Sequence, residues 1–128
     1  VPRFGAGCGG RAGPVTLAAA NTPWTGASFT MVANGMTANS LAVQLVGVQP
    51  LSVPLPGGAP GCSVFVDPIF AEAFVPSGGA VTTTWLVPDT AAAVGLTVRA
   101  QVVGVELSAV GIDRLTSSNA LRAVIGSL

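Results

Sequence analysis

The sequence predicts an all-β protein: a β-sandwich, Ig-like or jelly-roll-like, with about eight or nine short strands and one short helical turn. Runs of alternating or β-branched apolar residues recur along the chain, and turns rich in Gly, Pro, Asn and Asp separate them about every 8 to 12 residues. The 128 residues suffice for one domain that buries about two thirds of its unfolded surface. We therefore expect one sandwich domain, residues 14–128, preceded by a glycine-rich arm, residues 1–13.

The arm shows neither helical nor strand periodicity, and it carries Arg3, Phe4, Cys8 and Arg11 among its glycines. The chain begins at Val1 without an initiator methionine or a basic leader. Such a start is typical of the mature end that is left after removal of a signal peptide. These features predict an exported chain whose arm is held by its cysteine.

The first strands follow from alternation. Residues 14–18 begin the first strand, and the turn at 21–26 leads into a half-buried strand at 27–34, in which Phe29, Met31 and Ala33 share one face. Residues 40–48 form a strand that is apolar on both faces, with Leu41, Val43 and Leu45 opposite Ala42, Gln44, Val46 and Val48.

Prolines interrupt the next segment. Residues 50–60 contain four prolines, which exclude a helix and a central strand, so we expect this segment to follow a sheet edge with Val53 and Leu55 beneath it. Short strands follow at 62–66 and 69–75. The second places three side chains on one face, namely Phe70, Glu72 and Phe74.

The helical turn is predicted at residues 88–95, where Asp89 or Thr90 caps it and Gly95 ends it. It follows a strand of β-branched residues at 81–87, in which helix would be costly.

Two strands complete the chain. Residues 96–106 are predicted to form the longest strand, and residues 107–112 to continue it through a bulge. Residues 117–125 close the chain as a strand, in preference to a helix over 119–125, with Leu121, Ala123 and Ile125 on one face and Arg122 on the other.

The two cysteines, Cys8 and Cys62, are either two free thiols or one bridge. The chain has no histidine and no Cys-x-x-Cys pair, so it offers few ligands for zinc or an iron–sulfur cluster. Both cysteines lie in glycine-rich turns, which favours the bridge and an oxidising compartment. The bridge would fasten the arm to the middle of the chain and remove about 4 kcal/mol of unfolded-state entropy.

Charge is scarce: 8% of the residues are Asp, Glu, Lys or Arg, against about 25% in ordinary soluble domains. The basic residues are all arginine and are balanced by scattered acids. No basic patch exists, which argues against nucleic acid and anionic membranes as partners. The apolar runs are broken well before the roughly 18 residues of a spanning helix, so no membrane span is expected.

The sequence indicates no enzyme. A Ser-His-Asp or Cys-His site needs a base, and the chain has neither histidine nor lysine. Asp67 and Glu72 are the acids closest in sequence that a glycosidase could use, but turn and edge positions explain them better. Asp89 could begin a calcium site, yet helix capping explains it. We expect no catalytic residue, no cofactor and no metal.

The two tryptophans suggest different roles. Trp85 alternates with Val81, Thr83 and Val87 and is predicted to lie in the core. Trp24 lies in a Pro-Trp-Thr-Gly turn, where an exposed ring could stack on a sugar. Trp24 is therefore the candidate ligand contact.

Five segments together resemble an uncharacterised family of small secreted disulfide-containing β-domains, common in planctomycetes and other aquatic bacteria. They are Gly7-Cys8-Gly9, residues 61–64, Val87-Pro88-Asp89, residues 95–101 and residues 118–122. One departure is Val98, where the family pattern has an aromatic residue. The resemblance spans nearly the whole chain. It implies export, the bridge and a sandwich, and it supplies no catalytic residue.

The function predicted from these features is structural. If each strand buries one face, the outer rows carry Ala42, Val46, Val48, Val103 and Val105 with few charges to discourage association. We expect a secreted subunit that assembles with itself into an extracellular filament or surface layer, through an exchanged arm or last strand. The alternative is a monomeric cell-surface binding or adhesion module for a glycan or a protein.

Overall fold

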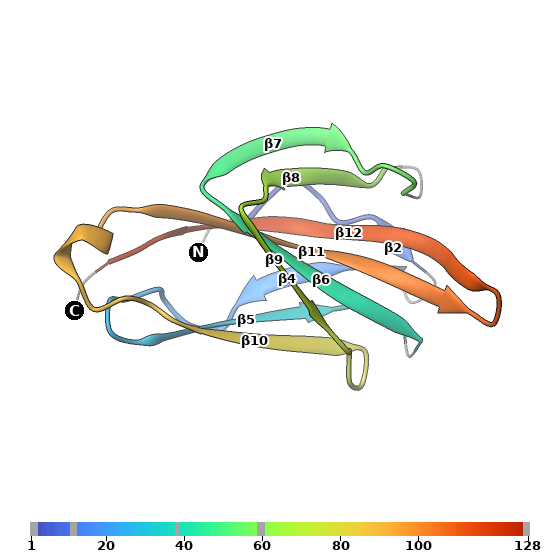
Figure 1. The fold of residues 1–128 in the computed structure, drawn as a ribbon, viewed down its shortest axis with the longest axis horizontal. Helices are drawn as coiled ribbons and strands as arrows, with labels where there is room; N and C mark the ends of the chain where they lie inside the picture. The colour runs from blue at the N-terminus through green and yellow to red at the C-terminus, as the bar shows by residue number, and fades with distance from the viewer. Residues whose placement is uncertain (1–2, 11–12, 38, 59–60, 127–128) are drawn as a thin grey trace.

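The computed structural model describes residues 3–10, 13–37, 39–58 and 61–126. Within these ranges the chain forms twelve strands and one 3₁₀ turn, Ala91–Ala93. Figure 1 shows an elongated molecule in which the sheets lie one above another and most strands run roughly along its length. The all-β prediction is confirmed.

Two antiparallel sheets face each other and form the sandwich. The larger sheet contains, in spatial order, β1 (Arg3–Phe4), β12 (Gly111–Val124), β11 (Thr97–Ser108), β6 (Ser40–Gly47) and β9 (Phe70–Phe74). The smaller sheet contains β10 (Ala80–Leu86), β5 (Ser28–Asn34) and β4 (Thr16–Ala19). The eight predicted strand segments thus correspond to β4, β5, β6, β8, β9, β10, β11 and β12.

The main core lies between these two sheets, because alternate residues of each strand point inward. The smaller sheet contributes the predicted row of Phe29, Met31 and Ala33, together with Leu17 and Val81. The larger sheet contributes Ala42, Val46, Ala100, Val102, Leu121 and Ala123.

A hairpin makes a third layer that the sequence did not predict. β7 (Gln49–Pro54) pairs with β8 (Ser63–Asp67), and the two strands lie across the outer face of the larger sheet (Figure 1). The ring of Phe65 meets that of Phe4 edge to face at 6.2 Å, on the same outer face. This layer buries part of a face that a two-layer sandwich would leave in solvent.

The prediction of an outer apolar row was therefore wrong at several residues. Ala42 and Val46 lie in the main core, and Val103 is buried on the outer face. Val48 and Val105 are half-buried. Because residues 40–48 are apolar on both faces, their pattern could not show which face points inward.

Three boundaries also differ from prediction. Residues 50–60 contain an edge strand, as the prolines suggested, but Val53 is exposed and only Leu55 is half-buried. β12, with 14 residues, is longer than β11, with 12. The predicted continuation of this strand through residues 107–112 is wrong, because β11 ends at Ser108, where the chain turns into a hairpin, and β12 begins at Gly111.

The arm forms short strands where none was expected. β1 pairs with β12, and β2 (Gly9–Gly10) pairs with β3 (Gly13–Pro14). Val1 and Arg11 lie outside the described residues. The helical turn is present, with Thr90 as its cap: the Ala92 backbone N–H donates to Thr90 Oγ1 at 3.4 Å.

The predicted disulfide is confirmed: Cys8 and Cys62 are bonded, with their Cα atoms 5.1 Å apart. Both cysteines are buried against β12. The backbone N–H of Cys8 donates to Ser117 O at 2.9 Å, and that of Ser63 donates to Ser117 Oγ at 3.1 Å. The bridge thus fixes the arm and the hairpin layer to the same strand.

Candidate functional site

The edge of β4 is closed by a side chain instead of a strand. Asn119, buried on β12, accepts a hydrogen bond from the Leu17 backbone N–H at 2.9 Å and donates from Nδ2 to Leu17 O at 2.9 Å. A side-chain amide offers one acceptor and two donors, so it can replace the backbone of a neighbouring strand. The free edge of β4 is thereby partly satisfied within the molecule.

Gln101 does the same for β8. Its fully buried side chain on β11 accepts from the Phe65 backbone N–H at 2.8 Å and donates to Ser63 O and Ser118 O, each at 2.8 Å. The amide therefore bonds the hairpin layer to the larger sheet. It also occupies the backbone groups with which β8 would otherwise pair.

The edges of β7 and β1 are poor templates for a further strand. β7 contains Pro50 and Pro54, which have no backbone N–H to donate. β1 has only two residues, one of them Arg3. Short, proline-containing or charged edges discourage pairing with other molecules.

β10 and β9 lack these protections along one side of the sandwich. β10 has seven residues with neither charge nor proline, and within the described residues no strand pairs with its outer edge. β9 is the matching edge of the larger sheet and carries one charge, Glu72. A hollow of about 440 Å³ separates them, lined by Phe70, Glu72, Phe74, Thr82, Thr83, Thr84, Trp85 and Leu86.

An apolar cavity of about 290 Å³ adjoins this hollow, and Trp85 and Leu86 line both. Its floor is the buried core, including Met31, Ala100 and Leu121, and its mouth carries the exposed side chains of Ile69, Leu86 and Leu96. None of its lining residues is charged. A dry apolar cavity of about 150 Å³ can hold benzene, so this cavity has room for larger apolar groups.

Two buried polar atoms beside the hollow have no hydrogen-bond partner among the described residues: Gln44 Oε1 and Thr83 Oγ1. The Gln44 amide donates only to Met31 Sδ, at 3.6 Å, and Thr83 is paired in register with the same Met31. A buried acceptor without a donor costs about 1–3 kcal/mol. The interior of the sandwich is therefore least satisfied on the side where its edges are open.

At the other end of the molecule, the β11–β12 hairpin presents an apolar tip. Val110 is 97% exposed and Ile112 is 67% exposed. The turn is ordered by Ser108, whose Oγ donates to Gly111 O at 3.3 Å and accepts from the Val110 backbone N–H at 3.4 Å. Figure 1 shows this hairpin projecting beyond the other strands.

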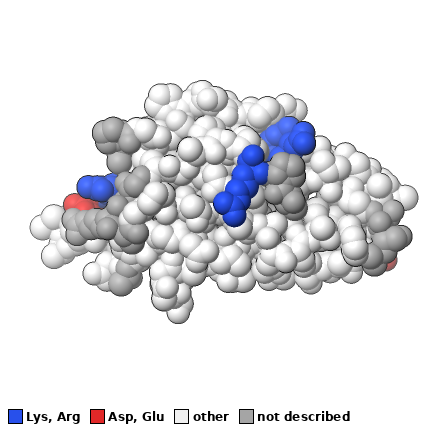
Figure 2. Space-filling view, turned by 180° about the vertical axis from the view of Figure 1, so that it is seen from behind, with Lys and Arg blue, Asp and Glu red and all other residues white. Residues whose placement is uncertain are grey.

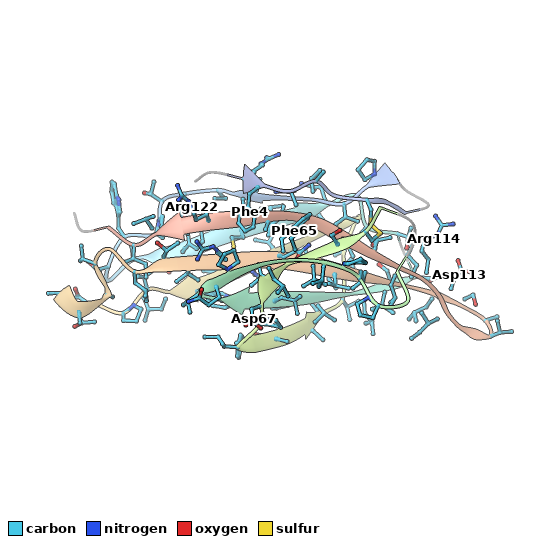
Figure 3. All side chains as sticks on the ribbon, turned by 90° about the horizontal axis from the view of Figure 1, so that it is seen from above. Phe4, Phe65, Asp67, Asp113, Arg114 and Arg122 are labelled. Carbon is cyan, nitrogen blue, oxygen red and sulfur yellow. A yellow bond between two sulfur atoms is a disulfide. The ribbon has the colours of Figure 1, made fainter. Side chains whose placement is uncertain are left out.

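Charged groups are few (Figure 2), but three of the five arginines lie together. Arg3, Arg99 and Arg122 line a shallow hollow of about 350 Å³ with Phe4 and Pro50. Arg99 and Arg122 are directly opposite each other, and Arg99 Nη1 also donates to Val48 O. Figure 3 places Asp113 and Arg114 near the hairpin tip, away from Arg122 and Asp67.

The candidate residues from the sequence are not brought together. Trp24 is 41% exposed and contacts the C-terminal segment, where its backbone forms a bridge with Gly126. Trp85 is half-buried against the core and meets Phe70 edge to face at 5.5 Å. Asp67 lies in the hairpin layer and Glu72 on β9, both exposed. The described residues contain no group of three or more potential metal ligands.

No local pattern in the sequence indicates the cavity or the amides that close the edges. Gln101 and Asn119 lie in two of the predicted strands, and an amide on a buried strand face can mark such a role. No protein-family model, curated protein or solved structure matches the chain. The resemblance to the planctomycete domains stays a prediction.

Proposed function

We propose that this chain is a non-enzymatic structural subunit that assembles with copies of itself into an extracellular filament or surface layer. The observation that carries the proposal is the open edge of β10: seven residues without charge or proline. Such an edge is a ready template for pairing with another chain. The contrast with β4 and β8, whose edges are occupied by side-chain amides, supports β10 as the contact.

The exposed apolar surface supports the same proposal, although it consists of other residues than the sequence suggested. Twelve large hydrophobic side chains are exposed among the described residues. They are Trp24, Leu41, Val53, Ile69, Phe70, Val75, Leu86, Val94, Leu96, Val110, Ile112 and Val124. With a formal net charge of zero, little electrostatic repulsion opposes association.

Edge pairing fits the fold better than exchange of a terminal strand. The arm is bridged at Cys8, so a neighbour could receive only the residues before it without reduction of the disulfide. β12 lies between β1 and β11, and its Leu121 and Ala123 are buried in the core. Exchange of β12 would dismantle the larger sheet.

Export and a non-enzymatic role rest on separate observations. The bridge supports an oxidising compartment. Among the described residues, no helix has the length and hydropathy to cross a membrane. The chain contains no histidine or lysine that could act as a base.

A charge placed on β10 tests the proposal. With the disulfide intact, we expect the native protein to form filaments or large species by electron microscopy and sedimentation. Thr84→Lys, at an exposed position of β10, should raise the concentration needed for assembly at least about tenfold. Thr16→Lys is the matched control, because Thr16 is also exposed but lies on the closed edge of β4. A native protein that stays monomeric over the whole concentration range and at high salt would contradict the proposal.

A monomeric adhesion module is the second candidate, favoured by the exposed ring of Trp24. In that case the native monomer binds an immobilised glycan, and Trp24→Ala abolishes binding without changing the Tm by more than a few degrees. Glycan binding that survives Trp24→Ala would show that Trp24 does not contact the glycan.

A further inference from the structure

We infer that the β11–β12 hairpin tip of one copy fills the apolar cavity at the opposite end of the next copy. This inference rests on the proposed function, since it names the second contact through which subunits assemble. The occupant of the cavity, whose mouth carries Leu86, Ile69 and Leu96, is a second copy of this chain.

The tip has a composition that a solvated turn does not explain. Turns favour Gly, Pro, Asn, Asp and Ser, whereas this tip consists of Ala109 and Val110. Val110 is almost completely exposed, and Ile112, paired across the hairpin with Leu107, extends the apolar surface. Because Ser108 bonds both sides of the turn, the tip is preorganised and loses little conformational freedom on binding.

The cavity is complementary to this tip in size and chemistry. Its volume of about 290 Å³ exceeds what one small apolar side chain would fill, and none of its lining residues carries a charge. The exposed apolar groups at its mouth would be buried around the entering hairpin. An amphipathic lipid suits the site less well, because none of the described lining residues has a polar or charged side chain that could hold its head group, apart from the indole of Trp85.

The positions of tip and cavity determine the kind of assembly. The cavity is lined in part by Ala93 of the 3₁₀ turn, and Figure 1 shows that turn and the hairpin tip at opposite ends of the long axis. A knob and a hole give a head-to-tail contact between unlike surfaces, and because the two lie at opposite ends of the long axis, we expect copies to stack end to end and not around a ring. Such a contact propagates into a linear filament, and pairing through β10 could then join neighbouring filaments.

Cysteine cross-linking tests the contact directly. The only native cysteines are bonded to each other and buried, so a bismaleimide reacts only with introduced thiols. The double variant Val110→Cys, Leu86→Cys should give a ladder of covalent oligomers under assembly conditions. A mixture of the two single variants should give dimers only. Neither substitution should destabilise the fold, because the side chains of Val110 and Leu86 are both exposed.

The matched control is Val110→Cys combined with Val75→Cys. Val75 is 76% exposed, as Leu86 is 75% exposed, but it does not line the cavity. This pair should cross-link at least about tenfold less. Ladders of equal yield from both double variants, or dimers of Val110→Cys alone, would overturn the head-to-tail contact.

Two further variants change the fit between the hairpin tip and the cavity without introducing a cysteine. Val110→Asp should lower the association constant at least about tenfold, because a carboxylate cannot enter an apolar cavity without losing its hydration. Ala100→Leu should fill part of the cavity from inside. It should reduce assembly by a similar factor while the Tm stays the same or rises, which separates occlusion from misfolding.

The outcomes distinguish this inference from the proposed function. If native subunits assemble but neither cross-linking nor Val110→Asp shows the tip in the cavity, the inference fails and self-assembly stands. If no assembly occurs, both fail. If the native protein stays monomeric and binds a fluorescent fatty acid equally well with and without Val110→Asp, the cavity is a lipid site and the inference is wrong.

Discussion

At the scale of single residues, two buried side-chain amides make the hydrogen bonds that a neighbouring strand would otherwise make. Asn119 satisfies both backbone groups of Leu17, and Gln101 satisfies Phe65 N–H and Ser63 O. Each side chain also belongs to a strand of the larger sheet, so it ties a separate layer to that sheet. The amides therefore stabilise the fold, and they also occupy the edges of β4 and β8, which could otherwise pair with another molecule.

Asn119→Asp should destabilise the fold by about 2–4 kcal/mol in urea unfolding. Replacement of the NH₂ group by oxygen removes the donor to Leu17 O and places a carboxylate in a buried site. Asn39→Asp is the control, because Asn39 is exposed, and should change stability by less than about 0.5 kcal/mol. Equal effects at the two positions would show that the Asn119 hydrogen bonds are unimportant.

At the scale of elements, the hairpin layer depends on a close approach of backbone to backbone. A Cβ atom on Gly47, at the end of β6, would lie 2.1 Å from Asp67 O at the end of β8. Only glycine allows the two strands to meet there. The third layer is therefore specified by one missing side chain as well as by Gln101.

Gly47→Ala should cost about 1–3 kcal/mol, since the backbone of Asp67 must shift to make room. The effect should appear in amide hydrogen exchange as faster exchange in β7 and β8. Gly126→Ala serves as the comparison, because its Cβ would meet Trp24 at 3.4 Å, an ordinary contact. If hydrogen exchange in β7 and β8 is unchanged by Gly47→Ala, the hairpin layer does not rely on this approach.

The strands were predictable to different degrees, for physical reasons. Alternation identified β5 and its buried row, because one face is polar. β6 has apolar residues on both faces, since one face packs in the core and the other lies partly beneath the hairpin layer, so its pattern fits either orientation. The two-residue strands of the arm are too short to show a period. Their pairing is imposed by β12 and by the disulfide.

At the scale of the whole molecule, the disulfide joins all three layers of the fold. Cys8 precedes β4 of the smaller sheet, Cys62 precedes β8 of the hairpin layer, and both rest on β12. The pairing was predictable because the chain has only two cysteines. The cavity was not, because it is lined by residues from segments far apart in the sequence whose packing no local pattern records.

Replacement of both cysteines by alanine should lower the free energy of unfolding by about 4 kcal/mol, the chain-entropy value for a sequence separation of 54 residues. Reduction of the native protein should give a similar loss. Urea unfolding with and without reductant measures both. A loss below about 1 kcal/mol would mean that the contacts of Cys8 with Ser117 hold the arm without the bond.

The central position of β12 affects how the protein is made. The larger sheet cannot join β1 to β11 until the segment through Val124 has been synthesised, so the sheet stays incomplete up to that point. Its native contacts are mostly between distant segments, and such folds form slowly. Until β12 is in place, the cavity, the projecting hairpin and the open edge do not exist together, so an unfinished chain offers its neighbours no complete docking partner.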